Sequence, residues 1–127
     1  MNLQQFENDN PELFEYIDVE EGIGRLRNNK RIYNLVLSEF LKDTHIDQTL
    51  DLAESGNLEE ASKTAHAIKG ITANLSMKKA YSDILEIEQK LKVGEYDKDL
   101  LLNAVASVAK TKELTQIILN NLEDIDF

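Results

Sequence analysis

Residues 57–75 read NLEEASKTAHAIKGITANL, and the fold of the chain is best understood from this stretch. Its small and apolar residues recur every three or four positions, which is the spacing of one face of an α-helix. Asn57 followed by Glu60 is similar to the capping box that starts many helices. We therefore expect a helix of roughly five turns, with a buried stripe formed by Leu58, Ala61, Ala65, Ile68, Thr72 and Leu75.

One histidine of this helix points away from the predicted core. Successive helical residues turn by about 100°, so His66 lies roughly 130° from the centre of the apolar stripe. Lys63 and Lys69 lie three residues on either side of it, and Gly70 lies four residues on. All three are neighbours of His66 on the helix surface. The sequence predicts an exposed imidazole with two lysines beside it.

This arrangement suits nucleophilic chemistry. A neutral imidazole can attack an activated phosphorus atom, and a nearby ammonium group offsets the charge of the incoming phosphoryl oxygens. Lys69 is the better placed ammonium and Lys63 the weaker one. Gly70 inside a helix costs about 1 kcal/mol relative to alanine, so it indicates either close packing of helices or close approach by a partner. The simplest alternative is a surface histidine that is only solvated.

The rest of the chain shows the same alternation of helix starts, apolar stripes and stops. Gly56 and Gly94 are expected to end two helices, and Gly22 and Gly24 to break the first. No segment alternates with a period of two, so no strand is expected. The short loops predict an all-α fold, an up-down antiparallel four-helix bundle with additional short N-terminal helices, in a single domain over residues 1–127. Helix starts are expected at or just after Asn10, Asn29, Thr44, Asn57, Ser76 and Asp97.

Composition excludes several classes of function. The formal net charge is -10, which disfavours binding to nucleic acids and to anionic membrane surfaces. The absence of cysteine excludes disulfides and thiolate metal sites, and it is typical of a reducing compartment, so we expect a cytoplasmic protein. No phosphate-binding glycine loop is present, so we expect no ATP-binding or autokinase activity and no enzyme. His45 and His66 alone make a weak case for zinc.

Five residues together resemble a known motif. His66, Lys69, Gly70, Asn74 and Leu75 are similar to the pattern of the histidine-containing phosphotransfer (HPt) domain, which has His-x-x-Lys-Gly and then Asn-Leu-Gly on an exposed helix of a four-helix bundle. The resemblance covers roughly residues 15–93, and the final helix matches only in length and amphipathicity. This chain departs from the pattern at Ser76, where the family has the last glycine.

The resemblance implies a role for each matched residue. His66 would accept a phosphoryl group from an aspartate of a receiver domain and donate it to another receiver. Lys69 would act near the phosphoryl group, and Glu88 of the following helix would lie near the imidazole and orient it. The alternative for Glu88 is a solvated surface carboxylate. The chain itself would bind no metal or cofactor, because the receiver would supply Mg²⁺.

The resemblance also implies the partners. We expect response-regulator receiver domains, a hybrid sensor kinase, or both, to dock transiently on a monomeric chain, around His66 and over Lys63, Ala67, Gly70 and Ala73. Two other interpretations stay open. The chain could be the substrate domain of a chemotaxis-type histidine kinase, or a helical interaction module in which His66 is incidental.

Overall fold

The protein is almost entirely helical in the computed structural model, which describes residues 1–127. No strand forms, and the only β-type contact is an isolated bridge between Asn2 and Asp126. The all-α class predicted from the sequence is therefore confirmed. The helices are α1 (Leu3–Asp9), α2 (Pro11–Tyr16), α3 (Val19–Gly24), α4 (Lys30–Lys42), α5 (His45–Glu54), α6 (Leu58–Asn74), α7 (Lys78–Lys92), α8 (Lys98–Asn121) and the short 3-10 helix η1 (Leu122–Asp124).

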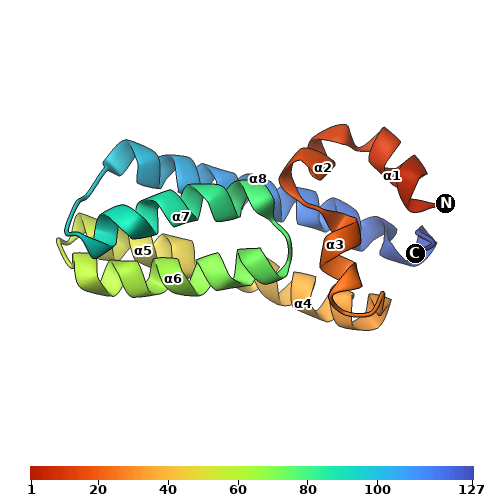
Figure 1. The fold of residues 1–127 in the computed structure, drawn as a ribbon, viewed down its shortest axis with the longest axis horizontal. Coiled ribbons are helices and arrows are strands. Elements are labelled where there is room, and N and C mark those ends of the chain that lie inside the picture. Colours follow the sequence, from red (N-terminus) through yellow and green to blue (C-terminus); the bar gives the residue numbers. More distant parts are fainter.

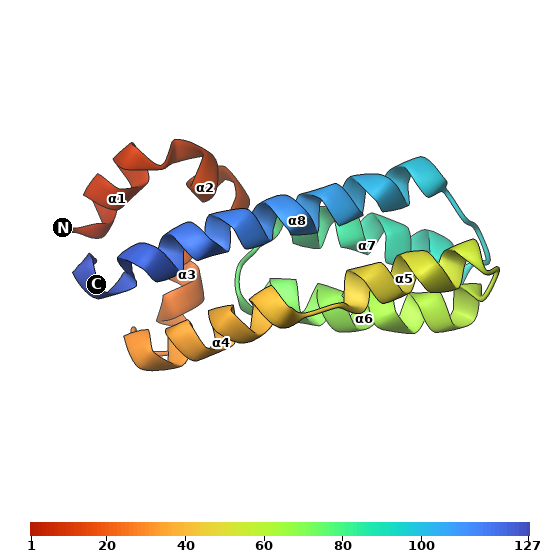
Figure 2. The ribbon, with the colours of Figure 1, turned by 180° about the vertical axis from the view of Figure 1, so that it is seen from behind.

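The longer helices lie side by side along the long axis of the molecule (Figure 1). Helix α6 contacts α5 and α7, and α8 contacts α7, α5 and α4. Seen from behind, α4 and α5 follow nearly the same line, interrupted only between Lys42 and His45 (Figure 2). The short helices α1–α3 lie at the end of the molecule where the two chain termini meet (Figures 1 and 2). Helix α6 is thus supported on two flanks.

Three of the expected helix starts have side-chain caps, including the one predicted at Asn57. The side-chain oxygens of Asn29, Asn57 and Asp97 accept hydrogen bonds from backbone N–H groups at the start of α4, α6 and α8. Such caps satisfy N–H groups that have no partner within the helix, and each contributes about 1 kcal/mol. The starts of these three helices therefore follow from local chemistry.

The N-terminal region differs from the prediction in its first helix. Helix α1 was not expected, yet Asn2 and Gln5 form a complete capping box at its start. Asn10 precedes Pro11, the first residue of α2, but its side chain does not cap that helix. Its amide instead donates to the Phe6 carbonyl oxygen at 3.0 Å. Asn10 therefore closes α1 rather than opening α2.

The first break in this region lies before the glycines. Gly22 and Gly24 were expected to interrupt a helix; Gly22 lies inside α3, whereas Gly24 is its last residue, where the helix ends. The chain becomes extended at Ile17 (φ -132°, ψ 123°) instead. Asp18 then starts α3, because its carboxylate accepts a hydrogen bond from the Glu21 N–H at 3.0 Å. The capping side chain, and not the glycines, determines where the helix begins.

Helix α5 begins where predicted but by different chemistry. The Thr44 side chain makes no cap, and its hydroxyl accepts a hydrogen bond from the Gln48 amide. The Asp43 carboxylate instead accepts from the His45 backbone N–H at 2.9 Å. The side chain that caps α5 is therefore that of Asp43 and not that of Thr44, and the helix still begins at His45.

A single hydrophobic core runs through the molecule and contains 26 buried side chains, so the helices share one interior and not several small ones. In α6, the predicted stripe is buried at Ala61, Ala65, Ile68 and Thr72, and Leu75 is buried just beyond the helix. Burying such apolar side chains is the main favourable term in folding. None of the helices combines the length and the apolar composition needed to cross a bilayer.

Gly22 lies in a close contact between α3 and the end of α6. A Cβ atom at this position would lie 3.1 Å from the Leu75 carbonyl oxygen and 3.4 Å from the Tyr33 hydroxyl oxygen. Tyr33 is completely buried and cannot move aside freely. Two residues on, a Cβ atom at Gly24 would meet nothing within 4 Å. Alanine substitutions at these two glycines can therefore be compared directly, because only at Gly22 would the added methyl group meet a neighbour.

We predict that Gly22→Ala lowers the free energy of unfolding by about 1 kcal/mol, because the added methyl group overpacks the contact. Gly24→Ala is expected to raise it by about 0.5 kcal/mol, because alanine restricts the unfolded chain without a clash. Urea denaturation followed by circular dichroism measures both changes. Equal effects of the two substitutions would contradict the packing role assigned to Gly22.

Candidate functional site

The exposed histidine lies on the uncovered side of α6. The His66 side chain is 68% exposed, while its neighbours Ala65 and Ile68 are buried. The outward orientation predicted from helical geometry is confirmed. The helix that presents it is stabilised at its start by the Asn57 cap and by Glu59 and Glu60 in the first turn, where carboxylates interact favourably with the helix dipole.

The imidazole contacts a buried carboxylate of the adjacent helix. His66 Nδ1 lies 2.9 Å from Glu88 Oε1, and Glu88 belongs to α7, which packs along α6. The Glu88 side chain is only 1% exposed. The prediction that Glu88 lies near the imidazole is confirmed, and the alternative of a solvated carboxylate is wrong. Glu88 is the only acidic or basic residue that is fully buried.

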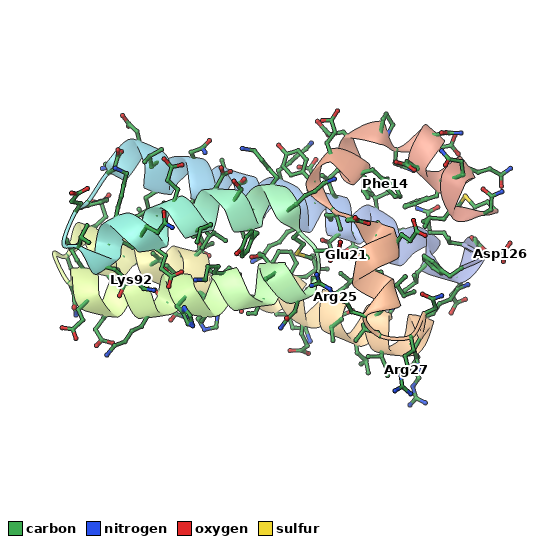
Figure 3. All side chains as sticks on the ribbon, viewed as in Figure 1. Phe14, Glu21, Arg25, Arg27, Lys92 and Asp126 are labelled. Carbon is green, nitrogen blue, oxygen red and sulfur yellow. The ribbon has the colours of Figure 1, made fainter.

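Two lysines compensate this buried charge. Lys69 Nζ lies 2.5 Å from Glu88 Oε2, although this contact lacks the angles of a hydrogen bond. Lys92 Nζ lies 2.9 Å from Glu88 Oε1. Figure 3 shows Lys92 near the end of α7, on the side of α6. One carboxylate therefore holds three nitrogen-bearing side chains, from two helices.

These contacts fix the ionisation of Glu88. Burial by itself would raise its pKa, but Lys69, Lys92 and His66 together outweigh burial and lower the pKa from its ordinary 4.5 to about 2. Glu88 is thus a carboxylate at neutral pH and can only accept hydrogen bonds. His66 Nδ1 must then be the donor. In the neutral ring, this leaves Nε2 without a proton and with a free lone pair.

The other predicted docking residues surround His66 on the open side. Lys63 Nζ lies 2.9 Å from Glu60 Oε1, and this contact raises the pKa of Lys63. Ala67 and Ala73 are half-buried. A Cβ atom at Gly70 would meet nothing within 4 Å. Close helix packing therefore does not explain Gly70, and the glycine leaves an open surface one turn from the imidazole.

The segment after α6 departs from the prediction at Ser76. Helix α7 begins at Lys78 with Met77 as its N-cap residue, so the expected cap at Ser76 is wrong. Ser76 instead has φ 55°, a left-handed conformation that glycine adopts most readily. Its hydroxyl donates to Glu21 Oε1 at 2.9 Å, and its carbonyl oxygen accepts from the Asp18 N–H. These bonds tie the end of α6 to α3.

The second histidine has a different setting. His45 is the first residue of α5, and its Nδ1 lies 2.7 Å from Asp43 Oδ2. Its side chain is partly exposed, as expected for a residue at a helix start. No three His, Asp or Glu side chains lie close enough together to hold a metal ion.

Sequence reasoning missed Lys92. The signal was present, because Glu88 and Lys92 are four residues apart on one helix, the spacing that favours an ion pair. The acidic partner lies closer to the helix start than the lysine, which is the favourable order. Without the position of α6, however, this pair looks like any other surface pair on a charged helix.

Comparison with known proteins finds no family model, no curated protein and no solved structure that matches this chain.

We predict that Glu88 stabilises the fold above about pH 4.5 and loses this effect as the pH falls towards 2. Its folded-state pKa is below its ordinary value, so protonation favours the unfolded chain. At neutral pH, Glu88→Gln should lower the free energy of unfolding by about 3 kcal/mol, the equivalent of this pKa shift. Urea denaturation from pH 2 to 7 should show the difference from the parent protein shrinking in acid.

The matched control for this experiment is Glu86→Gln, since Glu86 is exposed on the same helix and makes no ion pair. It should leave the stability profile unchanged. A constant difference between the Glu88→Gln variant and the parent at every pH would show that the carboxylate is not held in its charged form by these contacts.

Proposed function

We propose that the protein is a histidine phosphotransfer protein of a two-component phosphorelay. His66 would accept a phosphoryl group from a receiver-domain aspartate and pass it to another receiver. One observation carries the proposal: an exposed imidazole whose Nδ1 is bound 2.9 Å from a buried carboxylate, which leaves Nε2 free in solvent. A histidine that is only solvated needs no such partner, and burying Glu88 for it would be costly.

The geometry supports a simple transfer step. The Nε2 lone pair attacks the phosphorus of the aspartyl phosphate, the Nε2–P bond forms, and the P–O bond breaks so that aspartate leaves as a carboxylate. The Nδ1 proton stays on the ring, where Glu88 stabilises the positive charge that the imidazole gains. The reverse sequence passes the group on. Lys69 contacts the same carboxylate and lies one turn from His66 on α6, where it would interact with the phosphoryl oxygens.

The partner completes the site in this proposal. Phosphoryl transfer from the aspartate of a receiver needs a divalent cation on the phosphoryl oxygens, and the acidic pocket of the receiver would supply Mg²⁺. The receiver would dock transiently over Lys63, Ala67, Gly70 and Ala73, on a monomeric, cytoplasmic chain that does not phosphorylate itself. The open surface at Gly70 supports docking at this place.

The same proposal includes the finer architecture. We infer an up-down four-helix bundle in which α4 and α5 together form one member and α6, α7 and α8 the others. The contacts of α6 with α5 and α7, and of α8 with α7 and α5, support this arrangement. The short helices α1–α3 would be an addition to the bundle. Such a bundle presents α6 as a rigid platform for the histidine.

We predict that His66→Gln abolishes phosphorylation by a phosphorylated receiver domain while the helix content stays the same, because the substituted side chain is exposed. The measurement is transfer of radiolabel from the receiver, with detection of an acid-labile adduct. His45→Gln is the control and should accept label like the parent. Label retained by the His66→Gln variant would defeat the proposal. Labelling by an ATP-loaded kinase but by no receiver would favour a chemotaxis-type substrate domain instead.

A second prediction concerns Gly70. Gly70→Ala should raise the free energy of unfolding by about 1 kcal/mol, because alanine favours a helix interior and meets no neighbour there. It should nevertheless slow transfer from the receiver about fivefold, an effect on the order of 1 kcal/mol, because the methyl group occupies the docking surface.

The control for Gly70 is Asn103→Ala, at an exposed position of α8, which is a different helix from the one that bears His66. This substitution should also stabilise the protein but leave transfer unchanged. If Gly70→Ala transfers at the parent rate, the partner does not approach α6 at that turn.

A further inference from the structure

Lys92 is a charged group of the site that the transfer step above does not use. Its Nζ atom and His66 Nδ1 each lie 2.9 Å from the same atom, Glu88 Oε1. The ammonium group is therefore separated from the imidazole nitrogen by no more than twice that distance. It lies at the last turn of α7 and is linked to His66 through one buried carboxylate.

The two lysines of the site differ in their freedom to move. The Lys69 side chain is 20% exposed and contacts Glu88 Oε2, whereas the Lys92 side chain is 56% exposed. The Glu88 carboxylate is buried, so it cannot move out into solvent together with a charged partner. Of the groups around the carboxylate, Lys92 has the long, flexible and exposed side chain that can change partners at low cost.

The charges of the site also leave one ammonium in excess. Glu88 contributes one negative charge, and Lys69 and Lys92 contribute two positive charges. A phosphoryl group on a side chain carries a charge of about -1.5 to -2 at neutral pH and has three strong acceptor oxygens. Phosphorylation of His66 would therefore place a phosphoryl group with negative charge beside two ammonium groups that share a single carboxylate. Charge-assisted hydrogen bonds between such groups are strong.

We propose that Lys92 turns from Glu88 to the phosphoryl oxygens when His66 is phosphorylated, and so is a second cationic residue that binds the phosphoryl group in addition to Lys69. This inference rests on the proposed function, since it requires phosphorylation of His66. It assigns Lys92 a role that the sequence motif around His66 does not contain. Before phosphorylation, Glu88 Oε1 contacts both the ring nitrogen Nδ1 and the Lys92 ammonium group. After phosphorylation, it would contact only the ring.

The test uses potassium phosphoramidate as the donor, so that no receiver is needed. His66 Nε2 attacks phosphorus, the Nε2–P bond forms, and the P–N bond of the donor, whose nitrogen carries three protons at neutral pH, breaks so that neutral ammonia leaves with the electron pair. The phosphoryl group of the product is then titrated by ³¹P NMR in the parent and in Lys92→Met. A nearby cation lowers a phosphoryl pKa, so Lys92→Met should raise the midpoint by about half a unit, a modest shift because the side chain is exposed.

Two variants separate a phosphoryl contact from a structural role. Lys90→Met removes a lysine of the same helix that lies 3.8 Å from Glu95 and not at Glu88, and it should titrate like the parent. Lys92→Arg keeps the charge and should restore the parent midpoint. With a phosphorylated receiver as donor, Lys92→Met should slow transfer about fivefold relative to Lys90→Met.

The outcomes distinguish this inference from the proposed function. Suppose that the parent protein forms phosphohistidine and that its phosphoryl group titrates with the same midpoint in the Lys92→Met variant. Lys92 then does not contact the phosphoryl group, and this inference is wrong while the proposed function stands. If the parent forms no phosphohistidine at His66 with either donor, the proposed function fails and the inference falls with it. A raised midpoint in Lys92→Met, with parent behaviour in Lys90→Met and Lys92→Arg, supports the inference.

Discussion

The buried carboxylate of Glu88 is the constraint on which the site depends. Removing a charge from water is expensive unless close partners replace the lost hydration. Glu88 obtains those partners from His66 and Lys69 of α6 and from Lys92 of its own helix. The same contacts that keep the carboxylate charged also fix the imidazole tautomer. One carboxylate therefore links the packing of the two helices to the orientation of the exposed imidazole.

This constraint explains why the surrounding helices must pack accurately. The carboxylate of α7 and the imidazole of α6 meet only if the two helices keep their register, and the register is set by apolar residues that have no chemical role. Ile84, Ile87 and Leu91 are buried on the same helix as Glu88, and Ala65 and Ile68 are buried beside His66. A small shift of either helix would separate Nδ1 from Oε1. The core thus positions the site without taking part in it.

The sequence predicted those parts of the molecule that depend on local patterns. The stripe of α6 and the caps at Asn29, Asn57 and Asp97 follow from spacing and side-chain chemistry over a few residues. The orientation of His66 follows from the same stripe. The proximity of Glu88 required the resemblance to a known motif, since a carboxylate on a separate helix has no local signature.

What the sequence did not predict depends on contacts between distant segments. Gly22 appeared to be a helix breaker because its packing against Leu75 and Tyr33 is invisible in the sequence. Ser76 appeared to be an N-cap, but its left-handed backbone is held by bonds to α3. Lys92 was overlooked because an ion pair within one helix does not reveal that a third residue shares it.

The bonds of Ser76 have a consequence for how the two ends of the molecule are held together. Helices α5 to α8 each contact the next helix in sequence, and α8 also contacts α5. The N-terminal segment is joined to the end of α6 by the bond from Ser76 to Glu21, which links residues 55 positions apart, and by the bond from the Asp18 N–H to the Ser76 carbonyl oxygen. We therefore expect the N-terminal segment and the end of the histidine-bearing helix to loosen together when these bonds are lost.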